Sequence, residues 1–291
     1  MISGTGSLLR RAVPMLFAAG LLPAPGLHAQ VAITPPVVFL GHAGRFGNFA
    51  VRNQSETAQE VTIDFRFGYL TSDSLGNAVM QYDDSAAATR FSMASWVRAF
   101  PPRFILQPGH QQVVRLMAHP PSNLADGVYW TRLVTASMPQ SMPVDSLRNG
   151  VHTQIIFRMD QITAVFYQRG SAHTGIQLGS LSVRNDSAGL QLLIPLTRTG
   201  SAPFLGSVAV RIEDERGKVV HEVTLPGSVY FSLVERVLLP RTKLHPGHYT
   251  ATVRVIAERP DIPRDELLPM VPVMATTTFT LPTASAVATQ R

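Results

Sequence analysis

The sequence of 291 residues contains no cysteine, which excludes disulfide bonds, thiolate nucleophiles and cysteine-ligated metal sites. Its Lys and Arg residues are scattered rather than clustered, so nothing predicts nucleic-acid binding. No nucleophile elbow, phosphate loop or dinucleotide fingerprint is present, which indicates a protein that is not an enzyme and needs no cofactor. Beyond residue 29 there is neither an amphipathic helical pattern nor an apolar run of about 18 residues that could span a membrane.

Residues 1–29 have the features of a secretory signal peptide. Arg10 and Arg11 precede an apolar stretch, and Leu27-His28-Ala29 forms a cleavage site. The arginine pair also fits the twin-arginine route, but the rest of that motif is missing, which favours general export. We expect a mature chain that starts near Gln30. Cleavage lowers the formal charge from +6 to +4, because residues 1–29 contain two arginines and no acidic residue.

Short runs that alternate between apolar and polar residues dominate the chain, as in half-buried β-strands. The clearest runs cover residues 61–67, 112–116, 208–212, 249–255 and 277–281. The hydrophobic fraction of 45% is sufficient for a core, and the length suits two domains of roughly 100 to 150 residues each. The sequence therefore predicts an all-β protein of two domains.

Two motifs occur once in each half of the chain. Residues 46–55 align with residues 178–187, with Gly, Val, Arg, Asn and Ser in matching places. Residues 124–129 and 244–249 share the pattern Leu-x-x-Gly-x-Tyr, the sequence form of a tyrosine corner. In such a corner the phenol hydroxyl bonds upstream backbone where the chain enters a late strand of a sandwich. Two corners predict two immunoglobulin-like β-sandwiches in tandem.

A polar break at residues 168–176 marks the expected domain boundary. The predicted domains cover residues 30–168 and 169–282, followed by a frayed tail at 283–291. Inside the first domain, the polar segment 69–90 is expected to form an extended hairpin or loop.

An ordered series of segments spans the first domain and consists of residues 33–39, 50–53, 96–101, 103–109, 112–116 and 126–133. In this order they resemble the amino-terminal domain of the periplasmic chaperones of chaperone/usher pilus assembly. The second domain matches only in position and general sandwich pattern. The resemblance implies a periplasmic protein whose two domains form a boomerang. It also implies two partners, a secreted pilin-like subunit and an outer-membrane usher.

In that family the last strand of the first domain lends alternating apolar residues to an unfinished subunit. The resemblance therefore implies donor-strand complementation through residues 151–167, with Ile155, Phe157 and Met159 as the partner-binding row. An added edge strand satisfies the unpaired backbone of the subunit and covers its exposed core together. The alternative is that these three side chains fill the core of their own domain.

The family also anchors the terminal carboxylate of the subunit, with an Arg on the first strand and a Lys late in the donor strand. Aligned without gaps, these positions hold Pro36 and Ala164, which offer no charged side chain. Arg158 or Arg169 could replace the anchor, or the protein captures its partner differently. A second interpretation is a structural or adhesive tandem-sandwich protein of the envelope that has no chaperone activity.

Histidines and aspartates do not predict a metal site. His245 and His248 lie in the second corner turn without a nearby third ligand. Asp73, Asp83 and Asp84 lack the spacing and the central glycine of a calcium-binding loop.

Overall fold

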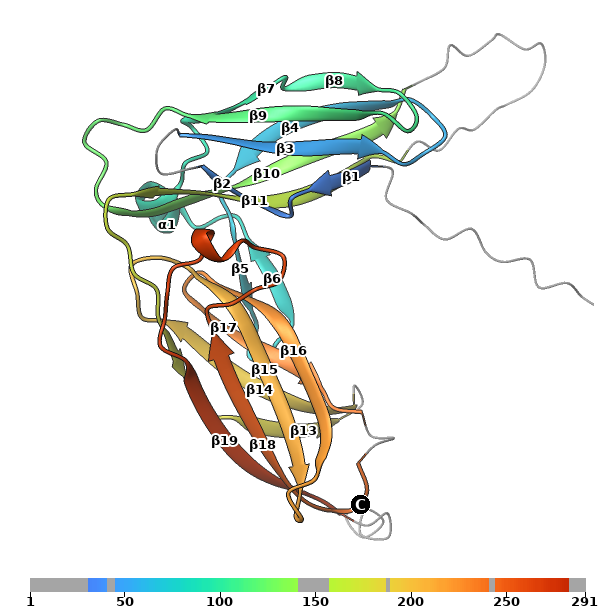
Figure 1. Cartoon of the computed structure of the whole chain (residues 1–291), viewed down its shortest axis with the longest axis vertical. Coiled ribbons are helices and arrows are strands. Elements are labelled where there is room, and N and C mark those ends of the chain that lie inside the picture. The colour runs from blue at the N-terminus through green and yellow to red at the C-terminus, as the bar shows by residue number, and fades with distance from the viewer. Residues whose placement is uncertain (1–30, 41–44, 141–156, 187–188, 241–243, 283–291) are drawn as a thin grey trace, which may run out of the picture.

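The structure, a computed structural model, describes residues 31–40, 45–140, 157–186, 189–240 and 244–282. Within these residues the chain forms two β-sandwiches, one after the other, whose long axes meet at an angle (Figure 1). The prediction of an all-β protein with two immunoglobulin-like sandwiches in a bent arrangement is confirmed. The strands of the first sandwich end at Arg169, and those of the second begin at Ile176.

The first sandwich pairs a four-stranded sheet with a five-stranded sheet. The four-stranded sheet has the order β1-β3-β9-β7, formed by Val31–Thr34, Phe46–Asn53, Gln111–Ala118 and Val97–Phe100. The five-stranded sheet has the order β2-β11-β10-β4-β8, formed by Val37–Leu40, Met159–Arg169, Gly127–Pro139, Gln59–Arg66 and Arg103–Leu106. Alternate residues of both sheets, among them Val51 and Leu133, are fully buried between them.

The second sandwich has two sheets of four strands. In one, β14 (Gly189–Arg198) pairs with β12 (Ile176–Leu178) and β13 (Ser182–Asp186), and also with β17 (Ser232–Leu238). The other has the order β16-β15-β18-β19, formed by Val219–Val229, Phe204–Asp214, Gly247–Ile256 and Val273–Leu281. Its core is continuous and apolar, with Leu192, Val210 and Val253 fully buried.

The opening strand is divided between the two sheets of the first domain. β1 pairs with β3, whereas β2 pairs with β11 in the opposite sheet. Pro35 and Pro36 separate the two strands and have no backbone N–H to donate to a ladder, so the chain leaves one sheet there and joins the other. Residues 33–39, which the sequence presents as one strand, are therefore two.

Both predicted tyrosine corners are present. The Tyr129 hydroxyl donates to the carbonyl of Ala125 at 2.9 Å, and the Tyr249 hydroxyl donates to the carbonyl of His245 at 2.8 Å. Each tyrosine is buried and lies early in a long strand, Tyr129 in β10 and Tyr249 in β18. The corner pattern thus marks equivalent strands of the two sandwiches.

The 46–55 and 178–187 repeat, in contrast, does not mark equivalent strands. Its first copy forms β3, which lies inside a sheet between β1 and β9. Its second copy contains β13, which among the described strands pairs with β14 alone. A short alternating strand that leads into a polar turn is a common local pattern, so its recurrence carries no information on sheet position.

Residues 69–91 form the predicted hairpin and, in addition, a short helix. The hairpin consists of β5 (Tyr69–Ser72) and β6 (Ala78–Gln81), and helix α1 covers Ser85–Phe91. A further 3₁₀ turn, η2, covers Arg264–Glu266. The expectation of no helix after residue 29 was wrong for α1, because a helix of seven residues is too short to show a periodic apolar face.

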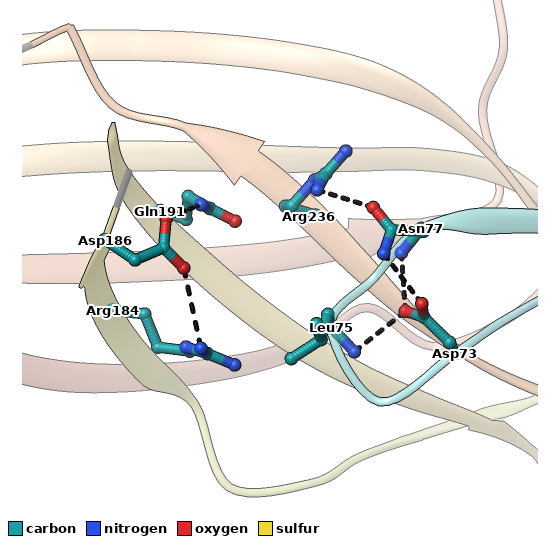
Figure 2. A network of polar contacts seen from close by, with 7 residues as sticks. All are labelled: Asp73, Leu75, Asn77, Arg184, Asp186, Gln191 and Arg236. Atoms are coloured by element: carbon teal, nitrogen blue, oxygen red, sulfur yellow. Dashed lines mark hydrogen bonds and ion pairs between the residues drawn. The ribbon is translucent and has the colours of Figure 1, made fainter. Parts of the chain in front are cut away.

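The hairpin extends from the first domain onto the second, where it lies against β17 (Figures 1 and 2). The Thr71 hydroxyl donates to the carbonyl of Ser232 at 3.1 Å, and the Ser72 hydroxyl oxygen accepts from the amide of Val234 at 2.6 Å. Since β17 is an edge strand, the hairpin covers backbone groups that would otherwise be open to another chain.

An apolar cluster fills the space between the domains. Trp130 and Phe166 of the first domain contact Tyr230 of the second, with ring centroids 5.1 and 6.0 Å apart. Trp130 and Tyr230 are almost fully buried, and Ile262, from the loop between β18 and β19, joins them. A buried aromatic contact of this kind holds the two sandwiches in one orientation.

Candidate functional site

The candidate site is the exposed edge of β11. β10 pairs with β11 along its whole length, from Met159 to Arg169. On the opposite side β2 pairs only with Ala164 to Tyr167. No described strand therefore pairs with Met159–Thr163 on the side away from β10, which leaves backbone hydrogen-bonding groups that an added strand could use.

Apolar side chains accompany this open edge. Phe157 is 69% exposed just before the strand, and Met159 is half-buried at its start. Ile155, the third residue of the predicted row, lies outside the described residues. Further along β11, the odd-numbered Val165 and Tyr167 belong to the core of the first sandwich. Met159 is also odd-numbered and therefore lies on the same face of β11 as Val165 and Tyr167, nearer to the rim of the sandwich.

The described members of the row do not fill the core of their own domain. Neither Phe157 nor Met159 belongs to the buried cluster of the first sandwich. Half-way along the row, the side-chain amide of Gln161 donates to the carbonyl of Val31 at 2.6 Å, which ties the open part of β11 to the first strand. A strand docking here would meet an ordered backbone and apolar side chains that reach toward solvent.

The two positions of the family anchor lie next to each other. Ala164 pairs with Val37, the residue that follows Pro36. Pro36 is exposed and Ala164 is buried, and neither carries a charge. The suggested replacements have local partners. Arg158 forms an exposed ion pair with Asp160 at 2.8 Å, and Arg169 donates to two loop carbonyls, of Pro121 and Ser122.

A cation that sequence reasoning missed lies directly across from Ala164. Arg132 of β10 is the register partner of Ala164, and only 7% of it is exposed. Its Nε donates to the carbonyl of Gly68 at 3.0 Å, and its Cζ lies 4.7 Å from the centre of the Tyr230 ring. Its buried Nη2 has no hydrogen-bond partner, and no ion pair involves it within the described residues.

No metal centre is found in the described part of the chain, where His, Asp and Glu form no group of three or more suited to a cation. His245 contributes its carbonyl to the tyrosine corner, and the His248 ring contacts the Thr280 hydroxyl at 2.9 Å. Asp73 and Asp84 bind backbone amides of their own turns. None of the described helices is long and apolar enough to cross a membrane.

No family model and no curated protein matches the sequence. Several solved structures match the fold. One is the CsuC–CsuE chaperone–tip adhesion subunit pre-assembly complex of Acinetobacter baumannii, at 15% identity and a TM-score of 0.42 over 85% of this chain and 98% of that chain. The chain is similar in structure to chaperones of pilus assembly.

Two further chaperones of this kind match at similar levels. The SafB chaperone, in complex with the SafA pilin of Salmonella enterica, is 15% identical, with a TM-score of 0.41 over 89% of this chain and 99% of that chain. The CupB2 chaperone of Pseudomonas aeruginosa is 12% identical, with a TM-score of 0.40 over 86% of this chain and all of that chain. At such identities the similarity concerns the fold, and the roles of β11 and Arg132 depend on their own geometry.

The sequence did contain a signal for Arg132. Arg132 is the one charged residue in the run 127–137. The structure buries every residue of this run. A lone arginine in an otherwise uncharged central strand indicates a special environment, because a buried cation is costly unless it is paired. Only the strand register shows that this arginine lies opposite Ala164.

Proposed function

We propose that this protein is a periplasmic chaperone-like protein that binds secreted pilin-like subunits by β-edge complementation along β11. The observation that carries the proposal is the open edge Met159–Thr163, flanked by the exposed Phe157. A subunit that lacks one strand would gain both a paired edge and a cover for its core. Full burial of the exposed Phe157 would contribute about 1.5–3 kcal/mol, and burial of the half-buried Met159 would contribute less.

The test is the affinity of the mature chain for a pilin-like subunit encoded beside it, measured by co-expression and by isothermal titration. Phe157→Asp is expected to weaken the complex at least about tenfold, since it removes the burial of one large side chain. Ile105→Asp is the matched control, because Ile105 is 52% exposed on β8, the strand at the opposite edge of the same sheet. Binding that survives Phe157→Asp would reject β11 as the docking edge, and its loss in Ile105→Asp alone would place the docking edge at β8.

For the subunit's terminal carboxylate, Arg132 has the most suitable geometry. It lies opposite Ala164, is buried, and retains an Nη2 group without a partner. A carboxylate there would supply the missing acceptor, and a charge-assisted hydrogen bond of this kind contributes about 1.5–3 kcal/mol. Arg158 and Arg169 remain alternative anchors.

These anchors are separated by comparing subunits that end in a carboxylate with subunits that end in an amide. Arg132→Gln should weaken binding of the carboxylate form by about tenfold or more and leave the amide form unchanged. Arg132→Lys keeps the charge without the planar fork and serves as the second variant. A carboxylate preference that is lost only in Arg158→Gln or Arg169→Gln would assign the anchor to that residue instead.

An usher would need a second surface, because β11 is occupied in a complex with a subunit. The outer face of the sheet β1-β3-β9-β7 suits an acidic partner, since these four strands contain no acidic residue. Exposed arginines and apolar side chains share this face, namely Arg52, Arg98, Arg115, Phe46, Phe100 and Val113. Arg115→Glu should weaken usher binding and leave subunit binding intact; the reverse result would place the usher elsewhere.

The alternative, a structural or adhesive envelope protein, is motivated by the uncharged Pro36 and Ala164. It makes the opposite prediction in the first experiment. If no secreted subunit forms a complex with the wild-type chain, the alternative is favoured and the chaperone proposal fails.

A further inference from the structure

A second group of unpaired cations lies where the two domains meet. A pocket of about 290 Å³ is lined there by Arg90 and Phe91 of α1, by Arg198 at the end of β14, by the start of β10, and by the adjoining loops. The loop residues come from both domains and include Asp126 and Ser201. No residue of β11 lines this pocket, and neither does Arg132.

The two guanidinium groups are held near the same aromatic ring. The Cζ atom of Arg90 lies 5.1 Å from the centre of the Phe91 ring, and the Cζ atom of Arg198 lies 5.4 Å from it. Arg198 also stacks on Phe231 of the second domain, at 4.9 Å. Stacking orients a guanidinium but leaves its in-plane N–H groups free to bind an acceptor.

The positive charges of this pair are not compensated. Within the described residues no ion pair involves Arg90 or Arg198, and the buried Nη1 of Arg198 has no hydrogen-bond partner. Burial, followed by the charge of Arg90, lowers the pKa of Arg198. Asp126 is the acid that lines the pocket; its carboxylate accepts from the amide of Ser171 at 3.2 Å and forms no ion pair with either arginine within the described residues.

A single bound oxyanion would supply both the missing hydrogen-bond acceptor of Arg198 and the missing negative charge. It would accept hydrogen bonds from the unpartnered Nη1 and from the fork of Arg90, and it would remove the repulsion between two like charges. We propose that this pocket binds an oxyanion of the carboxylate or phosphate class, which bridges Arg90 of the first domain and Arg198 of the second. Because the ligand contacts both domains, its binding stabilises their relative orientation.

The test uses the mature full-length chain and inorganic phosphate, compared with chloride at equal ionic strength. For a dissociation constant of about 1 mM, 20 mM phosphate is expected to raise the melting temperature by about 5 °C. Arg90→Gln and Arg198→Gln should each abolish this rise, whatever their own melting temperatures in chloride. Arg216→Gln is the control, since Arg216 is exposed in the turn between β15 and β16, and it should respond like the wild type.

The effect of phosphate on the complex with a subunit distinguishes a free oxyanion from a carboxylate of the partner chain. Succinate serves as a free carboxylate in the melting-temperature test. If the natural ligand is a free oxyanion, phosphate and a bound subunit act independently of each other. If it is a carboxylate of the partner chain, 20 mM phosphate should weaken the complex by about twentyfold at equal ionic strength, as competition at this dissociation constant requires. The proposal is overturned if neither phosphate nor succinate raises the melting temperature above that in chloride, or if Arg198→Gln responds like the wild type. The melting-temperature results need no subunit and so do not depend on the outcome for Phe157, whereas the competition result needs a complex that forms.

Discussion

Arg236 of β17 donates from Nη1 to Oδ1 of Asn77 at 2.7 Å, a contact that joins the second domain to the hairpin of the first (Figure 2). Asp73 shapes the hairpin turn on the other side of Asn77, because its carboxylate accepts from the backbone amides of Leu75 and Asn77 and from the Asn77 side chain. These hydrogen bonds from Asn77 and Leu75 stabilise the ionised carboxylate and so lower the pKa of Asp73. The turn therefore has internal hydrogen bonds in addition to its contact with β17.

Gly76 is the position where this contact is most sensitive. Its φ is +74°, and a Cβ there would lie 2.6 Å from the Cβ of Arg236. Gly76→Val should displace the hairpin from β17, with both sandwich cores intact. We expect a broader distribution of domain angles in small-angle scattering and faster hydrogen exchange at the amide of Val234, which now donates to Ser72.

Gly109→Val provides the matched control. Gly109 also has a positive φ, +72°, but nothing lies within 4 Å of a Cβ added there. It should show the same backbone strain without any change in the domain angle. Equal scattering profiles for the two variants would contradict the proposed role of the hairpin.

Glu235 is a carboxyl group in an unfavourable place on β17. Its strand neighbours Leu233 and Val237 point into the second core, and burial raises the pKa of Glu235. A raised pKa means that the folded state binds the proton more tightly, so stability is lost as pH rises from the ordinary Glu value through the folded one. Glu235→Gln should therefore raise the melting temperature at about pH 7.5 and have little effect at about pH 4. An equal effect at both values would contradict the assignment.

Tyr69 and Asp84 form a coupled pair at the start of α1. The Tyr69 hydroxyl donates to Oδ2 of Asp84 at 2.7 Å, while Oδ1 caps the helix by accepting from the amide of Ala87 at 2.8 Å. Burial, followed by the hydrogen bond to Asp84, raises the pKa of Tyr69 to about 12. The proton on Tyr69 thus favours the folded state below about pH 10, and this contribution is lost as pH rises toward 12.

Asp84→Asn should lower the pKa of Tyr69 only in part, because burial remains the largest cause of the shift. The measurement is the phenolate absorbance during alkaline titration. Tyr69→Phe identifies which component of the titration belongs to this residue. An unchanged curve in Asp84→Asn would show that the hydrogen bond does not influence the ionisation.

The two tyrosine corners allow each domain to be weakened separately. Tyr129→Phe and Tyr249→Phe each remove one hydrogen bond, to Ala125 and His245 respectively. Each should cost about 0.5–1.5 kcal/mol of unfolding free energy, and the two losses should add because the sites lie in different sandwiches. Chemical denaturation of the single and double variants checks both values, and a clearly non-additive pair would show that the corners are coupled.

Features that depend on neighbouring residues were predictable from the sequence. Alternation of period two marked residues that form β4, β9, β15, β18 and β19. The Leu-x-x-Gly-x-Tyr pattern located both corners, since each corner bond spans only four residues. The hairpin at residues 69–90 was also expected, whereas α1 was missed and the 46–55 repeat was misleading about sheet position.

The sequence alone thus determined an all-β chain of two sandwiches and pointed to residues 155–159 as an apolar row. Tertiary structure decided that β2 leaves the first half of β11 open on the side away from β10, that Arg132 lies opposite Ala164, and that Arg90 and Arg198 meet at one ring. The physical reason is that strand periodicity is a local property of the backbone, whereas register and domain contact join residues far apart in the chain. Those long-range pairings depend on how two complete cores pack, so they cannot be predicted from the pattern of a short segment.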